Sequence, residues 1–258
     1  MDTTVAVEKI NLFGISIHNM NMEEAIEEIH ALVSGGGKHF VATPNVDHIV
    51  RLHRDREFLE VYQKASLVVA DGLPIIWASR LLGKPLKERV AGSDLILPVC
   101  ELAAKEGFSI YFLGGERGVA EKAGEKLKLL FPSLQIAGSY APPFGFESDT
   151  AENQRIVQMI NEAKPDILFV ALGAPKQEKW IARHIEELRI KMALCVGAGI
   201  DFIAGAAKRA PRWMRGVGLE WLWRLVHDPK RLWKRYLVQD AKFLGIFFDE
   251  WRRLHLMK

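Results

Sequence analysis

Short apolar runs rich in β-branched residues alternate with segments of helical periodicity through about residue 205. This alternation is typical of βαβ units, in which helices join neighbouring parallel strands. It predicts an α/β domain with a Rossmann-like, mainly parallel sheet flanked by helices. We expect strands over residues 39–42, 67–70, 109–113, 135–138, 167–171 and 192–196. We expect helices over residues 22–33, 46–64, 74–82, 94–106, 119–130, 150–163 and 175–188.

The residues that follow the expected strands predict where a ligand binds. In an open parallel sheet the ligand crevice lies outside the carboxyl ends of the strands. Glycine, proline or a small polar residue follows nearly every strand, as a backbone-lined site for a polar ligand requires. Turns use the same residues, so any single loop is also open to a purely structural interpretation. The loops concerned are 43–45, 71–72, 114–116, 140–146, 172–177 and 197–199.

Asp71 directly follows an apolar strand and is expected at the rim of the crevice. Partial burial raises the proton affinity of a carboxylate, so Asp71 could act as a general base. The alternative is that it caps the helix beginning near Pro74. Thr43 and Asn45 end a neighbouring strand and offer neutral hydrogen-bonding groups suited to sugar hydroxyls or an amide. Asn45 could also simply cap its own helix.

Gly114 and Gly115 lie in a glycine-rich turn between a strand and a helix, where free N–H groups and the helix dipole favour a phosphate. Dinucleotide enzymes, methyltransferases and nucleotide-sugar enzymes share this pattern. An NAD site calls for an acidic residue about 20 residues further on. Residues 134–140 contain no carboxylate, which weakens the dehydrogenase alternative without excluding it. Arg89, just before a helix start, could clamp a phosphate or form a surface ion pair.

The last fifty residues differ in composition from the rest of the chain. Residues 208–258 hold 13 of the 35 Lys and Arg, 5 of the 32 Asp and Glu, and five of the 7 Trp. We therefore expect an α/β catalytic domain over 1–207 and a helical, basic appendage over 208–258. A helix over 230–254 is expected there, although Gly245 leaves two shorter helices open. Its apolar face would hold Trp233, Tyr236, Leu237, Leu244, Phe247, Phe248 and Trp251.

Tryptophans on an apolar stripe opposite cations suit an anionic membrane surface best. Nucleic-acid binding is disfavoured, because the indoles do not alternate with the cations as a stacking platform requires. Packing of the helix on the core or on another subunit stays open, and so does a homo-oligomer. The N-terminus lacks a secretory signal, and no apolar run approaches the ~20 residues that span a bilayer. These features predict a protein that is not exported, does not cross the membrane and associates with it peripherally.

No cofactor and no metal site are expected. Cys100 and Cys195 lie in apolar surroundings without metal-ligand spacing, which predicts two buried thiols. The chain also lacks the Asp-x-Asp pair with which many nucleotide-sugar transferases chelate a metal. Charge on a leaving group would then be neutralised by protein cations and helix N-termini.

Several motifs in order along the chain resemble the WecG/TagA/CpsF glycosyltransferase family, from about residue 14 to residue 236. The Glu-Arg-Val-Ala-Gly block at 88–92 and the Leu-Gly-Ala-Pro-Lys-Gln-Glu block at 172–178 are the most specific of them. The other matching motifs are Ala-Thr-Pro-Asn at 42–45, Ala-Asp-Gly at 70–72, Phe-Leu-Gly-Gly at 112–115 and Asp-Phe-Ile-Ala-Gly at 201–205.

The resemblance implies a cytoplasmic, inverting transferase that associates peripherally with the inner face of the cell membrane. Its donor would be UDP-N-acetylmannosamine or the corresponding uronic acid, and its acceptor N-acetylglucosamine linked to undecaprenyl diphosphate. Such an enzyme serves synthesis of a surface polymer such as wall teichoic acid. A nucleotide-binding oxidoreductase or epimerase using the Gly114–Gly115 turn is the alternative.

The resemblance also assigns roles to residues. It makes Asp71 the catalytic base and places Thr43, Asn45, Arg89 and Gln177 in the substrate pocket. The appendage cations of the family fall on Arg224, Arg231 and Lys234. Lys234 is a departure, since arginine is expected there and a lysine cannot form the same bidentate contact with a diphosphate.

Overall fold

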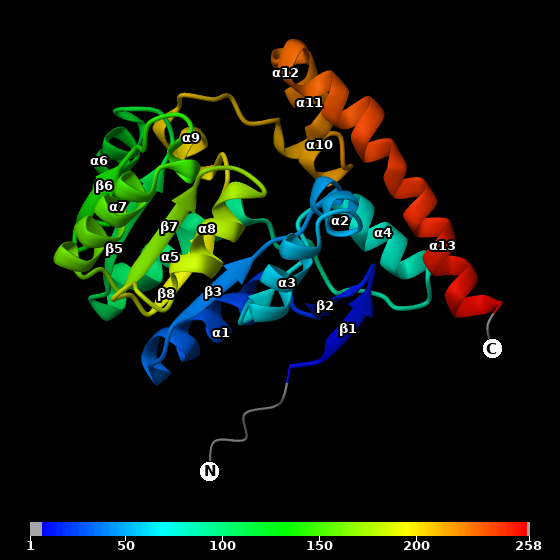
Figure 1. The fold of residues 1–258 in the computed structure, drawn as a ribbon, viewed down its shortest axis with the longest axis horizontal. Helices are drawn as coiled ribbons and strands as arrows, with labels where there is room; N and C mark the ends of the chain where they lie inside the picture. The colour runs from blue at the N-terminus through cyan, green and yellow to red at the C-terminus, as the bar shows by residue number, and fades with distance from the viewer. Residues whose placement is uncertain (1–6, 257–258) are drawn as a thin grey trace.

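In the computed structural model, which describes residues 7–256, six parallel strands form the central sheet. Their spatial order is β4-β3-β8-β7-β5-β6, and helices cover both faces (Figure 1). This confirms the predicted fold class. The strands are β3 (His39–Ala42), β4 (Leu67–Val68), β5 (Ser109–Gly114), β6 (Gln135–Tyr140), β7 (Ile167–Ala171) and β8 (Met192–Cys195).

The helices between the strands begin and end close to the expected positions, with one difference. The expected helix over 46–64 is two helices, because residues 53–55 leave the helical path and the Asp55 side chain caps the second by accepting the N–H of Phe58 at 3.0 Å. The helices of the α/β region are α1 (Met22–Gly35), α2 (Val46–Leu52), α3 (Arg56–Lys64), α4 (Leu73–Leu81), α5 (Gly92–Glu106), α6 (Val119–Leu130), α7 (Thr150–Ala163), α8 (Lys176–His184) and α9 (Gly199–Ala204).

A small antiparallel hairpin, β1 (Lys9–Leu12) and β2 (Ile15–His18), precedes the sheet and was not predicted. Phe13 and Gly14 form its turn with φ angles of 53° and 84°, as a two-residue hairpin turn requires. The His18 ring accepts the backbone N–H of Val68 at 3.0 Å. This bond ties the hairpin to β4 at the edge of the sheet.

Two hydrophobic clusters lie on opposite faces of the sheet because successive strand side chains point to opposite sides. Leu113 and Val170 belong to one cluster, whereas Phe112 and Phe169 stack at 5.5 Å in the other. Both cysteines are free and buried, as predicted, and burial raises the pKa of the Cys100 thiol to about 12.

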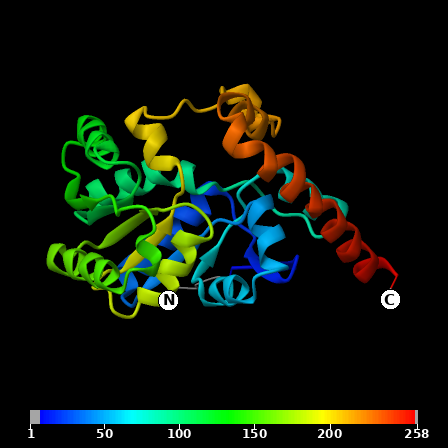
Figure 2. The ribbon, with the colours of Figure 1, turned by 45° about the horizontal axis from the view of Figure 1, so that its top comes forward.

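The chain crosses from α9 to the appendage as an extended segment, seen in Figures 1 and 2. The appendage packs on the α/β region, since Phe243 contacts Phe13 with ring centroids 5.2 Å apart. The division at residue 207 itself stays a prediction. Among residues 7–256, no helix is long and apolar enough to cross a bilayer. The appendage contains α10 (Arg212–Gly216), α11 (Glu220–His227), α12 (Pro229–Trp233), a π-helical turn η2 (Lys234–Gln239), a 3₁₀ turn η3 (Asp240–Lys242) and α13 (Phe243–His255).

The predicted apolar face of the appendage helix is only partly observed. Trp233, Leu237 and Phe248 are exposed. Tyr236 instead lines a cavity and Phe247 packs against the core, so these two side chains do not share the exposed surface of the other three. The π and 3₁₀ turns change the residues per turn within the segment, and a projection at a uniform 100° per residue therefore misplaces its faces.

Candidate active site

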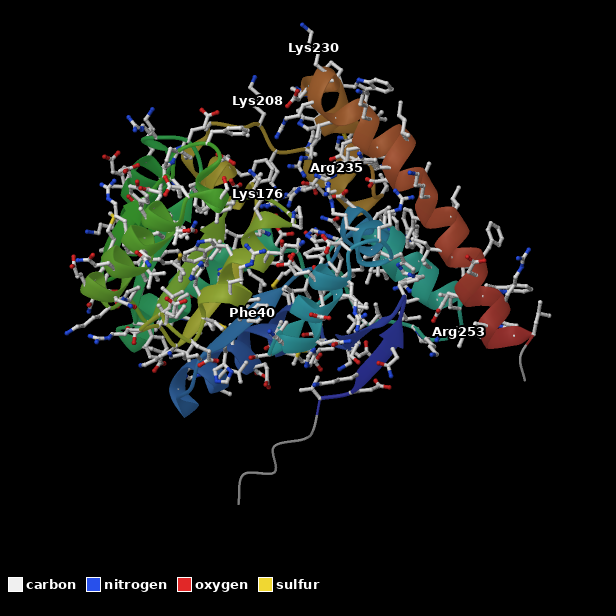
Figure 3. All side chains as sticks on the ribbon, viewed as in Figure 1. Phe40, Lys176, Lys208, Lys230, Arg235 and Arg253 are labelled. Atoms are coloured by element: carbon white, nitrogen blue, oxygen red, sulfur yellow. The ribbon has the colours of Figure 1, made fainter. Side chains whose placement is uncertain are left out.

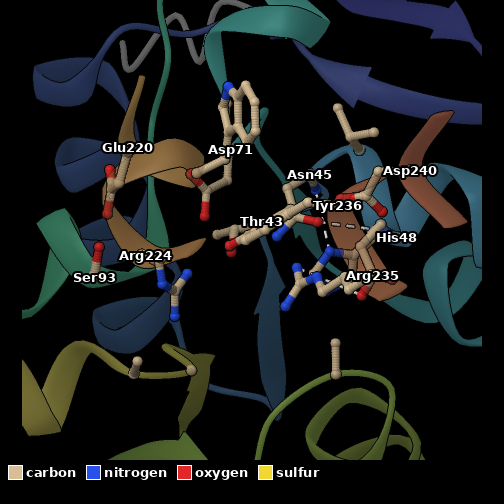
Figure 4. Close-up of a pocket in the computed structure, with 18 of the residues that line it drawn as sticks. Thr43, Asn45, His48, Asp71, Ser93, Glu220, Arg224, Arg235, Tyr236 and Asp240 are labelled. Atoms are coloured by element: carbon tan, nitrogen blue, oxygen red, sulfur yellow. Dashed lines mark hydrogen bonds and ion pairs between the residues drawn. The ribbon is translucent and has the colours of Figure 1, made fainter. Parts of the chain in front are cut away.

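A cavity of about 630 Å³ lies between the carboxyl ends of the strands and the appendage. The structure brings Thr43, Asn45, Asp71, Arg89, Gln177, Arg224 and Arg231 together in its lining. Three residues predicted for the site, Gly114, Gly115 and Lys234, are not among the lining residues. In Figure 4, Glu220 and Arg224 lie on one side of Asp71 and Thr43, and Arg235, His48 and Asp240 lie on the other.

Asp71 is fixed at the cavity wall by its backbone N–H, which donates to the carbonyl of Pro44 at 2.8 Å. It does not cap α4, whose N-cap is Gly72 and has no side-chain cap bond. Loss of water around the carboxylate raises the pKa of Asp71 to about 6, although the Arg89 guanidinium 3.6 Å away lowers it. A carboxylate with this pKa, facing a cavity, is suited to accept a proton near neutral pH.

Arg89 is mostly buried and belongs to a network that crosses from the α/β region to the appendage. Its Nη2 lies 2.6 Å from Asp94 Oδ2. Asp94 Oδ1 in turn lies 2.5 Å from Arg209 and 3.6 Å from Arg215, both of the appendage. Burial alone would raise the pKa of Asp94, but Arg209 and Arg89 hold it below its ordinary value. The arginine beside Asp71 is thus oriented by a carboxylate that the appendage also holds.

Sequence reasoning missed Asp94 as a site residue, although it lies only two residues after the Glu-Arg-Val-Ala-Gly block. Gly92 in that block shows why a small residue is needed at the start of α5. A Cβ there would lie 2.6 Å from the carbonyl oxygen of Cys195 and 2.9 Å from Thr43 Oγ1. The glycine therefore lets α5 approach the ends of β3 and β8 closely.

Asn45 and Gln177 already have protein partners. Asn45 Oδ1 accepts the N–H of His48 at 3.3 Å, which confirms the capping alternative, while the residue also lines the cavity. Gln177 Oε1 accepts the N–H of Gly197 at 3.1 Å and its Nε2 donates to Glu178 Oε1 at 2.7 Å. Gln177 thereby holds the loop after β8 in place.

The opposite wall of the cavity is a polar cluster joining α2, α8 and η2. His48 Nε2 lies 3.3 Å from Glu178 Oε1, and Arg235 of the appendage lies 3.5 Å from Asp47. Burial, with Asp47 nearby, raises the pKa of Asp240 to about 6. Within the part of the chain that the structure describes, Arg235 Nε and Asp240 Oδ1 are buried without a hydrogen-bond partner. Both residues line the cavity.

The cavity lining holds five arginines and five carboxylates, and the carboxylates are those of Asp47, Asp71, Asp201, Glu220 and Asp240. The five guanidinium groups are those of Arg89, Arg215, Arg224, Arg231 and Arg235. Planar guanidinium groups match phosphate oxygens in pairs, so this arrangement suits a diphosphate. Among residues 7–256 no group of three or more His, Cys, Asp or Glu could hold a metal ion.

Gly114 has a structural role at the end of β5. Its φ is +109°, and a Cβ would lie 2.4 Å from the carbonyl oxygen of Ala171 on β7. The next N–H, of Gly115, donates to the same oxygen at 3.1 Å. The turn therefore closes tightly on β7, which separates β5 from β8, and β3 lies one strand further away. Lys234 also lies off the cavity, with its ammonium 5.7 Å from the Trp233 ring centroid.

Gly114→Ala is expected to lower the free energy of unfolding by about 3 kcal/mol, from strain at a left-handed φ and overpacking. Urea denaturation followed by circular dichroism measures it. Gly35→Ala is the matched control, since no atom lies within 4 Å of a Cβ there and its φ is not left-handed. Equal stability of both variants would contradict the packing role of Gly114.

The comparison with known proteins agrees with this geometry. The sequence profile of the glycosyl transferase WecG/TagA/CpsF family matches residues 10–256. The chain belongs to this family. Relatives in the MRSA252 and MW2 strains of Staphylococcus aureus are each 30% identical over 226 residues, 87% of this chain and 87% of the relative. Both are named N-acetylglucosaminyldiphosphoundecaprenol N-acetyl-beta-D-mannosaminyltransferase.

Membership in the WecG/TagA/CpsF family confirms the resemblance drawn from the motifs and makes the chain a glycosyl transferase. It does not favour an oxidoreductase or epimerase. The match extends to residue 256, so it includes the appendage that supplies four of the five cavity arginines.

Proposed function

We propose that the chain transfers N-acetylmannosamine, or its uronic acid, from UDP to N-acetylglucosamine linked to undecaprenyl diphosphate, with inversion, in synthesis of a surface polymer such as wall teichoic acid. The relatives' printed names support the acceptor and the sugar. The single observation that carries the proposal is the placement of Asp71 in one cavity with five arginines. Such a cavity offers a base for a sugar hydroxyl and cations for a diphosphate.

In the proposed mechanism, Asp71 removes the proton from the acceptor hydroxyl while that oxygen attacks the anomeric carbon of the donor sugar. The bond between this carbon and the β-phosphate oxygen breaks on the opposite side, which inverts the configuration. UDP leaves with the electron pair of that bond. Arginines and helix N-termini then stabilise the added charge on the diphosphate.

We assign Arg224 and Arg231 of the appendage to binding of the diphosphate. Arg224 lies over the Phe202 ring at 6.0 Å, beside α9, and both Arg224 and Arg231 lower the pKa of Asp201, which burial raises overall. The Phe202 contact places Arg224 near the loop after β8, and the effect of Arg231 on Asp201 places this second guanidinium within electrostatic reach of the same region. We assign Lys234 no diphosphate contact, because it does not line the cavity.

We further propose peripheral association with the inner face of the cell membrane. Large apolar side chains are exposed along the appendage, among them Trp213 at 66% and Val226 at 69%. Figure 3 shows Lys208 and Lys230 pointing away from the body, whereas Arg235 points inward. Exposed indoles and cations together favour the headgroup region of an anionic bilayer.

The test is transfer by the full chain to a short-chain lipid-diphosphate N-acetylglucosamine, with each UDP-sugar supplied separately. We expect UDP release and a product whose mass identifies either N-acetylmannosamine or its uronic acid. Chelator should not change the rate. A thermal shift with NAD, without any shift or transfer with UDP-sugars, would contradict the proposal and support the oxidoreductase alternative.

A further inference from the structure

Helix α4 carries an apolar stripe that does not pack against the hydrophobic core. Ile75 and Ile76 on one side of the helix are buried in the hydrophobic cluster. On the other side Trp77 is 45% exposed and Leu81 is 69% exposed. Leu73, four residues before Trp77, lines the catalytic cavity. Since residues four apart share a helix face, the stripe begins in the cavity and runs outward along α4.

Helix α13 of the appendage lies beside α4 (Figures 1 and 2). It supplies a second apolar stripe. Phe243 and Phe247 pack into the cluster that also contains Ile75 and Ile76. Leu244 lines the cavity, and it and Phe248 are 62% and 56% exposed. These two side chains are again four residues apart and continue from the cavity along α13.

The turn between α10 and α11 joins the appendage to the stripe on α4. A Cβ at Gly218 would lie 2.7 Å from Cη2 of Trp77, so the indole packs directly beneath this turn. Trp221, which follows, lines the cavity and is 38% exposed. An apolar surface therefore extends from the cavity mouth over both α4 and the appendage.

We propose that the polyprenyl chain of the acceptor leaves the cavity along α4, over Leu73, Trp77 and Leu81. On its other side the polyprenyl chain contacts Leu244 and Phe248 of α13. This inference rests on the proposed function and names the binding site for the hydrocarbon part of its acceptor.

The chemistry of the cavity lining supports this path. A lipid-diphosphate sugar presents a hydroxyl, then two phosphates, then hydrocarbon. The cavity lining holds a partner for each of these parts, namely Asp71, the guanidinium groups and apolar residues of both stripes. Leu73 and Leu244 both line the cavity. A hydrocarbon chain tethered to a diphosphate bound in the cavity passes these two residues on its way out.

The double variant Trp77→Ser/Leu81→Ser tests the path, assayed in detergent micelles so that no bilayer is present. Two acceptors are compared, N-acetylglucosamine diphosphate with an undecaprenyl tail and the same headgroup with a methyl tail. We expect the KM for the undecaprenyl acceptor to rise about 10-fold, since lost hydrocarbon contact weakens binding. The KM for the methyl acceptor, the KM for the UDP-sugar and kcat should stay unchanged.

Leu129→Ser is the matched control, because Leu129 on α6 is 82% exposed and does not line the cavity. It should behave as wild type with both acceptors. An unchanged KM for the undecaprenyl acceptor in the double variant would overturn the path, and so would an equal rise for both acceptors. Loss of vesicle binding with an unchanged KM in micelles would also overturn it and assign the stripe to the bilayer. Failure of the proposed function is distinguishable, since wild type would then use neither acceptor.

Discussion

Asp71→Asn is expected to lower kcat by about 100- to 10,000-fold, the usual contribution of a positioned general base. The amide keeps the size of the side chain but cannot accept the proton of the acceptor hydroxyl. Affinity for UDP, measured by titration calorimetry, should stay near that of wild type, because the cavity arginines are unchanged. Asp249→Asn, at an exposed carboxylate of α13, is the control.

The same assignment predicts a pH dependence. Only the ionised carboxylate acts as a base, and the pKa of Asp71 is raised to about 6. The value of kcat/KM should therefore rise as pH increases through about 6 and level off above it. Transfer by Asp71→Asn at the wild-type rate would refute the role of Asp71, and a profile without an acid limb near pH 6 would contradict its raised pKa.

A chain ending at residue 211 is expected to lose about 1,000-fold or more in turnover and to stop binding anionic vesicles. The truncation removes Arg215, which contacts Asp94, together with the cavity arginines Arg224, Arg231 and Arg235. A single preorganised donor to developing negative charge contributes about 100- to 1,000-fold. Transfer assays in micelles and vesicle sedimentation measure the two losses separately.

Truncation also uncovers Phe13 and its neighbours, so a point variant is needed beside it. Arg224→Gln/Arg231→Gln keeps the appendage but removes two cavity cations. We expect transfer to fall about 100-fold or more while vesicle binding is retained. A fully active truncation would contradict the assignment of the appendage to catalysis.

Most strands of the sheet could be predicted because they are short apolar runs bounded by turn residues, although β6, Gln-Ile-Ala-Gly-Ser-Tyr, is more polar. The hairpin β1–β2 was missed, since two strands of 4 residues each give too little alternation to stand out. The break between α2 and α3 was missed for a different reason. Asp55 can cap a helix or lie within one, and local sequence does not decide between these roles.

Asp71, Arg89 and the residues around them could be predicted because they follow strands whose carboxyl ends must meet. Gly114 was expected in the cavity because the sequence does not reveal strand order. In the sheet β5 lies beyond β7, away from β3 and β8. Contacts such as those of Asp94 with Arg209 and of Arg235 with Asp47 join segments far apart in the chain. A local sequence pattern does not predict such contacts.

The π-helical turn η2 determines which side of α13 faces the core. Arg235 and Tyr236 within η2 line the cavity, while Phe243, at the start of α13, packs on the core. Removing one residue between them would turn α13 by about 100° about its axis. The core-packing side of α13 would then swing toward solvent, and the hydrocarbon-facing side would be lost. We therefore expect the length of this segment to tolerate insertion and deletion far less than its exposed side chains tolerate substitution.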